Sequence, residues 1–187
     1  MNMAENENRR SKMTRKLFRD SLKELLVEKE FGRISVNEIC KRADMNRSTF
    51  YAHYEDQYAL MREVEDEFLE CLTAIIRQTG QESFYIQYLE FLRFIYANGR
   101  LFLLMTNQNG LFRDRIIETV CSLLQSIGLA PKGDPFFIQK ARYAAAGSLW
   151  LVERWIDGSD DATVEEMADL LIRLFGEVGA GNQPADV

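Results

Sequence analysis

Proline is nearly absent from this chain, which favours helices along most of its length. The prolines stand at positions 131, 135 and 184 of the 187 residues. Because proline in a helix interior removes a backbone hydrogen bond and kinks or breaks the helix, the segments before position 131 are free to be helical. No alternation of apolar and polar residues with the two-residue period of a strand persists. The sequence therefore predicts an all-α fold.

Apolar spacing and helix-breaking residues divide the chain into about nine expected helices. Leu22, Leu25 and Leu26 follow the helical period in the first of them, and Gly32 interrupts the pattern after it. We expect a three-helix domain over 1–56 and a helical bundle domain over 57–187. The expected helices cover residues 14–29, 35–43, 47–54, 56–78, 82–97, 100–106, 110–127, 135–157 and 162–178.

The second and third expected helices are short and are joined by a three-residue turn. The segment "SVNE" at 35–38 has the pattern of a capping box, in which Ser35 and Glu38 each bind the other's backbone amide. The segment "DMN" at 44–46 supplies turn-forming residues, and Asn46 can cap the third helix. Two short helices joined in this way form a helix-turn-helix, whose second helix enters the major groove of DNA.

The third helix, within "NRSTFYAHYED" at 46–56, has one apolar and one polar face. Phe50 and Tyr54 are four residues apart and share a face that is expected to pack inward. The guanidinium on the other face can bind guanine with two hydrogen bonds, and the hydroxyls and the imidazole can reach base edges or phosphates. The candidate DNA-binding residues of this helix are Arg47, Ser48, Thr49, Tyr51 and His53.

The charge distribution separates the first 60 residues from the rest. The net charge is −6, but residues 1–60 hold 12 basic against 10 acidic side chains, and residues 61–187 hold 11 against 19. The acidic segment "EVEDEFLE" at 63–70 is expected to be the solvated face of a helix. A basic run over 9–19 suits an arm that contacts phosphates, although the solvated start of a helix remains the alternative. The basic run contains Arg9, Arg10, Lys12, Arg15, Lys16 and Arg19.

Few features point to other classes of protein. The first residues are charged, with no apolar segment of a signal peptide behind them, and the apolar runs are too short to span a bilayer, so we expect a cytoplasmic protein. His53 is the sole histidine, and we expect neither a metal site nor another cofactor. No phosphate-binding loop, pair of carboxylates or nucleophile motif indicates an enzyme.

The helix-turn-helix segment resembles the DNA-binding domain of the TetR/AcrR family of transcriptional regulators. Family members have "(T/S)xxxIAxxAGVSxxTxYxHFxxKxxL", and this chain has "SVNEICKRADMNRSTFYAHYEDQYAL" from position 35, within a resemblance that spans 14–60. The resemblance implies further DNA contacts by Ser35 and Asn37. Asp44 stands where glycine is usual, which aspartate tolerates. Gln57 stands where a phosphate-binding lysine is usual, which removes one ion pair to DNA.

The last two expected helices resemble those of one subgroup of the same family. The matching segment, from position 144, is "AAAGSLWLVERWIDGSDDATVEEMADLLIRLF". In the family, this helix pair meets its copy in a second chain as a four-helix bundle. The alternative is that the same side chains pack within one chain. The resemblance implies a homodimer with an interface at Gly147, Leu149, Trp155, Leu170 and Leu174.

A regulator of this family is expected to keep a pocket for a small-molecule effector among its middle helices. Aromatic and methionine side chains are frequent between 84 and 112, and core packing accounts for most of them. Pockets of this kind combine apolar walls with a few polar groups. The candidate ligand-binding residues are Tyr85, Tyr88, Arg93, Tyr96 and Met105.

Two functions remain open on the sequence. The first is a ligand-responsive homodimeric repressor that binds a palindromic operator on double-stranded DNA. The second is a regulatory binding protein that does not bind DNA and acts by pairing with another regulator. The groove-facing residues of the third helix favour the first function. Gln57 and the small positive charge of the first 60 residues favour the second. No membrane partner is expected for either.

Overall fold

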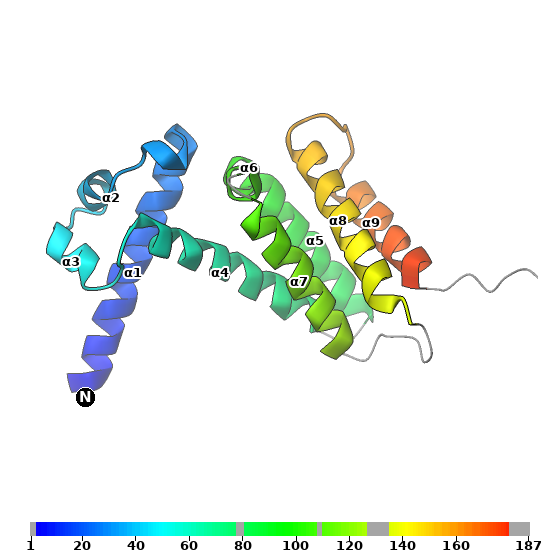
Figure 1. Ribbon diagram of the computed structural model, residues 1–187, viewed down its shortest axis with the longest axis horizontal. Helices are drawn as coiled ribbons and strands as arrows, with labels where there is room; N and C mark the ends of the chain where they lie inside the picture. The colour runs from blue at the N-terminus through cyan, green and yellow to red at the C-terminus, as the bar shows by residue number, and fades with distance from the viewer. Residues whose placement is uncertain (1–2, 78–80, 108–109, 127–134, 180–187) are drawn as a thin grey trace, which may run out of the picture. The chain divides into compact units, whose positions relative to one another are not determined.

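The chain is all-helical over the residues that the structure describes, as the sequence predicts. The computed structural model describes residues 3–77, 81–107, 110–126 and 135–179 (Figure 1). None of the helices within these ranges is both long and apolar enough to cross a membrane. The helices there are α1 Met3–Glu28, a 3-10 turn Phe31–Arg33, α2 Val36–Arg42, α3 Arg47–Tyr51, α4 Gln57–Ile76, α5 Gln81–Ala97, α6 Gly99–Asn107, α7 Leu111–Ser126, α8 Phe137–Ile156 and α9 Val164–Gly179.

The chain folds as two compact units, Met1–Phe68 and Leu69–Val187. Helix α4 begins in the first unit and ends in the second. The first unit therefore includes the helix-turn-helix and the first turns of α4. The functional domain boundary that we expect between 56 and 57 stays a prediction.

Two helix ends differ most from the expected positions. Helix α1 begins at Met3 rather than at 14, because the preceding polar segment has no glycine or proline and is rich in the helix formers Glu, Arg and Lys. Helix α3 ends at Tyr51 rather than at 54. There the Phe50 carbonyl accepts hydrogen bonds from the amides of both His53 and Tyr54, each at 2.9 Å. This tight turn ends the helix.

The capping box predicted at the start of α2 is confirmed. The Ser35 hydroxyl accepts a hydrogen bond from the Glu38 amide at 3.3 Å, and the Glu38 carboxylate accepts one from the Ser35 amide at 3.0 Å. The same carboxylate pairs with the Lys29 ammonium. The hydrogen bond from Lys29, followed by those from Ser35, lowers the pKa of Glu38 to about 2.

The core of the first unit is built around aromatic rings from α1 and from the α3 segment. Phe18 and Phe50 are fully buried, and Tyr54 is nearly so. The Phe18 ring meets those of Phe50 and Tyr54 edge-on, with centroid separations of 5.3 Å and 6.1 Å. Edge-to-face pairs add roughly 0.5–1.5 kcal/mol to the stabilisation from burial. The predicted inward face of the third helix is confirmed.

In the second unit, α8 packs against both α7 and α9, and α5 packs against α9. The indole of Trp155 is buried and donates a hydrogen bond to the Ala162 carbonyl at 2.7 Å, which joins the end of α8 to the segment before α9. Helix α6 begins at Gly99, where a Cβ atom would lie 2.4 Å from Cγ2 of Ile156. Glycine is required there because α6 and α8 approach each other so closely.

Replacing Gly99 by alanine should destabilise the fold by about 1–3 kcal/mol, because the added Cβ overpacks a site against a β-branched side chain. The free energy of unfolding in urea measures this change. The control is Gly176→Ala in α9, where no atom of the described residues beyond the adjoining helix backbone lies within 4 Å of the added Cβ. That substitution should be neutral or stabilising by up to about 1 kcal/mol. Equal effects of the two substitutions would contradict the close approach of α6 and α8.

Replacing Glu38 by glutamine should destabilise the fold more at pH 6 than at pH 2. The pKa of Glu38 is lowered on folding, so its contribution to stability is complete above the ordinary pKa of a carboxyl group. That contribution is lost as the pH falls toward about 2. Urea unfolding of both proteins across this pH range checks the prediction. The exposed Glu55, changed to glutamine, should show a small difference at all pH values. A pH-independent effect of Glu38→Gln would rule out the linkage.

Candidate nucleic-acid interface

The turn between α2 and α3 contains a backbone conformation that glycine usually supplies. Among the described residues, Asp44 is the one non-glycine residue with a positive φ, of 52°. Its amide donates to the Lys41 carbonyl at 3.4 Å, and the Met45 amide donates to the Cys40 carbonyl at 2.9 Å. These two bonds form a Schellman motif, which ends α2 and redirects the chain toward α3. Aspartate tolerates this left-handed region, as the sequence predicts.

Asn46 caps α3 and holds the hydroxyl groups of its first turn. Its side-chain oxygen accepts hydrogen bonds from the Thr49 amide at 2.8 Å, the Thr49 hydroxyl at 2.9 Å and the Ser48 hydroxyl at 2.6 Å. Ser48 is exposed and Thr49 is half-buried. Both hydroxyls therefore stand at the N-terminal end of α3, which is the end that contacts base edges in helix-turn-helix proteins.

Arg47 and Tyr51 form a pair on the outer face of α3. The Arg47 guanidinium donates a hydrogen bond to the Tyr51 hydroxyl at 3.2 Å, and its Cζ lies 5.7 Å from the centroid of the ring. The hydrogen bond also raises the pKa of Arg47, so the guanidinium stays charged. Tyr51 is 49% exposed. The pair thus exposes to solvent a guanidinium that is restrained by its contact with the Tyr51 ring.

The remaining residues predicted to contact DNA differ in the exposure and the hydrogen bonding of their side chains. Asn37 is exposed on α2, and His53 is half-buried in the turn after α3. Ser35 is exposed, but its amide and hydroxyl both donate to the Glu38 carboxylate, at 3.0 Å and 2.8 Å. The donors of Ser35 are therefore occupied within α2. DNA contact by these three residues stays a prediction.

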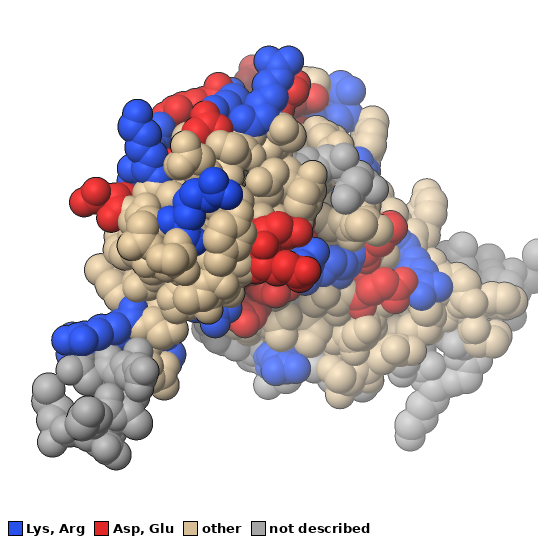
Figure 2. All heavy atoms as spheres, turned by 60° about the vertical axis from the view of Figure 1, so that its left-hand side comes forward, with Lys and Arg blue, Asp and Glu red and all other residues tan. Residues whose placement is uncertain are grey.

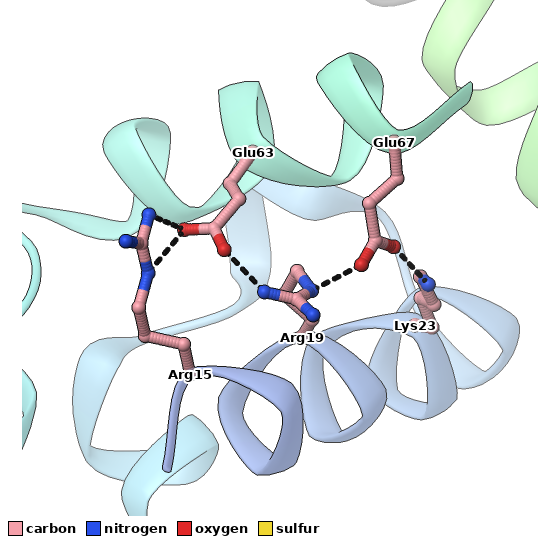
Figure 3. A network of polar contacts seen from close by, with 5 residues as sticks. All are labelled: Arg15, Arg19, Lys23, Glu63 and Glu67. Atoms are coloured by element: carbon pink, nitrogen blue, oxygen red, sulfur yellow. Dashed lines mark hydrogen bonds and ion pairs between the residues drawn. The ribbon is translucent and has the colours of Figure 1, made fainter. Parts of the chain in front are cut away.

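Several cations of the first unit are paired with carboxylates, which the sequence analysis missed. Arg15 and Arg19 bind Glu63, and Arg19 and Lys23 bind Glu67, in an ion-pair ladder between α1 and α4 (Figure 3). Arg15 and Arg19 of the basic run are thus engaged in ion pairs within the first unit, and the acidic segment is not wholly solvated, contrary to expectation. Figure 2 shows Lys and Arg side chains interspersed with Asp and Glu over the face that it displays. The four-residue spacing of these charges places each set on one helix face, but it does not indicate which helix lies opposite.

Two of the candidate ligand-binding residues form polar bridges between α5 and α9. The Tyr85 hydroxyl donates to Asp169 at 3.0 Å, and the Arg93 guanidinium lies 2.6 Å from the Glu165 carboxylate. Tyr85 is half-buried, and the charged pair is exposed. These contacts give both side chains a structural role in holding α5 to α9.

Tyr96 is the one candidate ligand-binding residue that lines the described pocket of the second unit. This open pocket has a volume of about 640 Å³, and Tyr96, Arg100, Asn107 and Ile156 contribute to its walls. The Tyr96 ring stacks on Trp155 with a centroid separation of 4.7 Å. The other two candidates, Met105 and Tyr88, are not among the residues that line this pocket. Met105 is buried in the core, and burial raises the pKa of the Tyr88 hydroxyl. Among the described residues, no group of His, Cys, Asp and Glu side chains could hold a metal ion.

The residues predicted at the dimer interface differ in how far they are buried within the second unit. Leu149 and Trp155 are buried within the second unit, so their side chains belong to its core. Gly147 is exposed, and Leu170 and Leu174 are half-buried. The sequence analysis missed the exposed aromatic residues on the outer face of α8. These are Tyr143, which is 78% exposed, and Trp150, which is 52% exposed and lies beside the Arg154 guanidinium.

Comparison with known proteins agrees with the geometry of the first unit. Residues 19–64 match the family model described as bacterial regulatory proteins, tetR family. No curated protein matches the chain.

Solved structures share the fold across both units. A TetR-family transcriptional regulator from Syntrophomonas wolfei is 17% identical, with a TM-score of 0.69, and the match covers 94% of this chain and 99% of that one. A TetR transcriptional regulator from Streptococcus agalactiae is 21% identical, with a TM-score of 0.65 and coverage of 92% and 98%. The dihydroxyacetone kinase operon activator DhaS is 18% identical, with a TM-score of 0.63 and coverage of 88% and 93%. Residues 19–64 thus match the N-terminal domain model of the tetR family of bacterial regulatory proteins, and the chain shares the fold of solved structures that belong to this family.

Proposed function

We propose that this regulator binds double-stranded DNA by placing α3 in the major groove. The observation that carries the proposal is the division of the α3 segment into a buried aromatic face and an outer face of hydrogen-bonding side chains. Phe50 and Tyr54 are buried in the core of the first unit, whereas Arg47, Ser48 and Tyr51 are exposed. An exposed helix face of this composition matches the donor and acceptor pattern of base edges and phosphates.

Arg47 is the proposed reader of sequence. A guanidinium can donate two hydrogen bonds to O6 and N7 of guanine, and such a pair contributes roughly 1–3 kcal/mol of discrimination. Its contact with Tyr51 restrains the guanidinium before DNA arrives, so less side-chain entropy is lost on binding. Ser48 and Thr49 can exchange their bonds to Asn46 for bonds to a base edge or a phosphate.

The basic run supplies the proposed contacts with phosphates that do not depend on sequence. Arg9, Arg10, Lys12 and Lys16 are exposed along the N-terminal half of α1. Each cation that neutralises a phosphate releases a counterion and adds to the salt dependence of binding. The two ladder arginines of the same run are engaged with Glu63, so the net basic surface for DNA is smaller than the sequence suggests.

We propose that two copies bind a palindromic operator through a dimer formed by α8 and α9. A two-fold dimer presents two copies of α3 to successive major grooves, which matches the symmetry of a palindrome. The exposed face of α8 with Tyr143, Gly147 and Trp150 supports such an interface, since exposed aromatic side chains often mark protein contacts. Half-buried Leu170 and Leu174 on α9 can extend it.

Repression that a ligand relieves is the proposed mode of regulation. The pocket beside Tyr96 is large enough for a small molecule. A ligand shifts the equilibrium only if it binds the DNA-incompetent conformation more tightly than the competent one. One structural relative is described as an operon activator, and activation would use the same DNA-binding residues. A regulator that pairs with another protein without binding DNA is the alternative.

Replacing both Thr49 and Tyr51 by alanine should lower the affinity for a specific duplex by about 100-fold, because two contacts of roughly 1–3 kcal/mol each are lost. The probe is the duplex that the unaltered chain selects from a random pool, and fluorescence anisotropy measures its binding. Sedimentation should show an unchanged oligomeric state. Ser122→Ala, which removes an exposed hydroxyl from α7, is the control. Unchanged affinity in the double variant would refute the docking of α3.

Replacing Gln57 by lysine should tighten binding to all duplexes and steepen the dependence of log K on log salt by about one unit. Gln57 is the first residue of α4, where a lysine can reach a phosphate beside α3. Titrations over a range of salt concentrations measure the slope. The control, Gln125→Lys on α7, makes the same change in net charge at an exposed position in the second unit. Equal slopes for the two variants would mean that position 57 does not face a phosphate.

A further inference from the structure

Five side chains of alternating charge form the ion-pair ladder between α1 and α4. Nη2 of Arg15 lies 2.7 Å from Oε2 of Glu63, and the Glu63 carboxylate also binds Arg19. Nε of Arg19 lies 2.5 Å from Oε1 of Glu67, whose other oxygen lies 2.7 Å from Nζ of Lys23. The three cations follow one another at four-residue spacing on α1, and so do the two carboxylates on α4, so each set shares one helix face.

The middle of the ladder is shielded from water. The side chains of Glu63 and Arg19 are 17% and 18% exposed, whereas that of Arg15, at one end, is 47% exposed. Burial alone would raise the pKa of Glu63, but the neighbouring Arg15, Tyr54 and Arg19 side chains outweigh it and hold that pKa below its usual range. A shielded ion pair that loses one partner is destabilised more than an exposed one. Glu63 is therefore the carboxylate on which the ladder most depends.

The Glu63 end of the ladder meets the segment that anchors the DNA-contacting helix. The Arg15 guanidinium carbon lies 5.9 Å from the centroid of the Tyr54 ring. The Tyr54 ring in turn lies 5.4 Å from that of Phe50, which is the buried residue of α3. A chain of contacts thus runs from Glu63 through Arg15 and Tyr54 to Phe50. The Lys23 end of the ladder lies two helical turns farther along α1.

We propose that Glu63 is a positioning residue for DNA binding, which fixes the end of α3 by holding Arg15 over Tyr54. The proposal rests on the proposed function, in which α3 contacts DNA. It assigns a favourable role to a carboxylate whose charge repels phosphates. Electrostatics alone predicts that removing this charge strengthens DNA binding. The positioning role predicts that removing the Glu63 carboxylate weakens specific DNA binding. The electrostatic effect and the positioning effect on affinity therefore have opposite signs.

The test compares three single substitutions in the full chain. Glu63→Gln removes the proposed positioning carboxylate. Glu55→Gln removes an equal charge from an exposed site between α3 and α4. Lys23→Met removes the far end of the ladder, so it shows how much of the effect follows from weakening the ladder at a site away from Tyr54. Binding is measured with the duplex selected by the unaltered chain and with a scrambled duplex of the same composition. Amide hydrogen exchange of His53 and Tyr54 is measured without DNA.

We expect Glu63→Gln to weaken binding of the selected duplex by about five- to tenfold, as for loss of a partly buried network of pairs. Binding of the scrambled duplex should be unchanged or tighter. The His53 and Tyr54 amides, which both donate to the Phe50 carbonyl, should exchange faster by a similar factor. Glu55→Gln should strengthen binding to both duplexes slightly and leave exchange unchanged. Lys23→Met should have less than half the effect of Glu63→Gln on exchange.

Two results would overturn the positioning role of Glu63, and a third would overturn the proposed function instead. Tighter specific binding by Glu63→Gln would show that its charge, not its position, matters. Equal effects of Lys23→Met and Glu63→Gln on exchange would reduce the ladder to a general stabiliser and overturn the positioning role. If the unaltered chain selects no duplex, the proposed function fails. The exchange measurements still decide whether Glu63 positions the end of α3.

Discussion

Burial of Phe50 and Tyr54 against Phe18 is the interaction on which the candidate DNA-binding surface depends. Helix α3 has five residues, and a helix this short is unstable in water without tertiary packing. The aromatic cluster supplies that packing, with ring centroids 5.3 Å and 6.1 Å from Phe18. Because the rings fix which side of α3 faces the core, they also fix which side faces outward. The polar face is a consequence of the buried one.

Side chains outside α3 hold both of its ends. At the start, Asp44 turns the backbone, and the Asn46 side chain accepts hydrogen bonds from the Thr49 amide and from the Ser48 and Thr49 hydroxyls. At the end, Tyr54 lies beneath the Arg15 guanidinium, which is bound to Glu63 of α4. An interface that must match base edges gains from such restraint, because a rigid reader loses little entropy when it binds. The first unit thus supplies the rigidity that sequence-specific binding by the proposed regulator needs.

Local patterns in the sequence predicted the local structure, but they did not predict which side chains pair between helices that are distant in the sequence. The capping box, the tolerance of Asp44 and the inward face of α3 follow from residues a few positions apart. The ladder joins Arg15 to Glu63, which are 48 positions apart, and helical spacing does not say which helix lies opposite. The same gap explains α8: the resemblance to the family implied an interface that includes Gly147, Leu149 and Trp155. Only the packing of α8 against α7 and α9 shows that Leu149 and Trp155 are buried within the unit.

The most direct measurement of the central claim is selection of duplexes from a random pool by the unaltered chain, followed by sequencing of the bound fraction. The account predicts one enriched palindrome, with half-sites about one helical turn of DNA apart. Guanines at fixed positions within each half-site would match the reach of Arg47. No enrichment over the starting pool at moderate salt would contradict the account and would favour a regulator that acts through a protein partner.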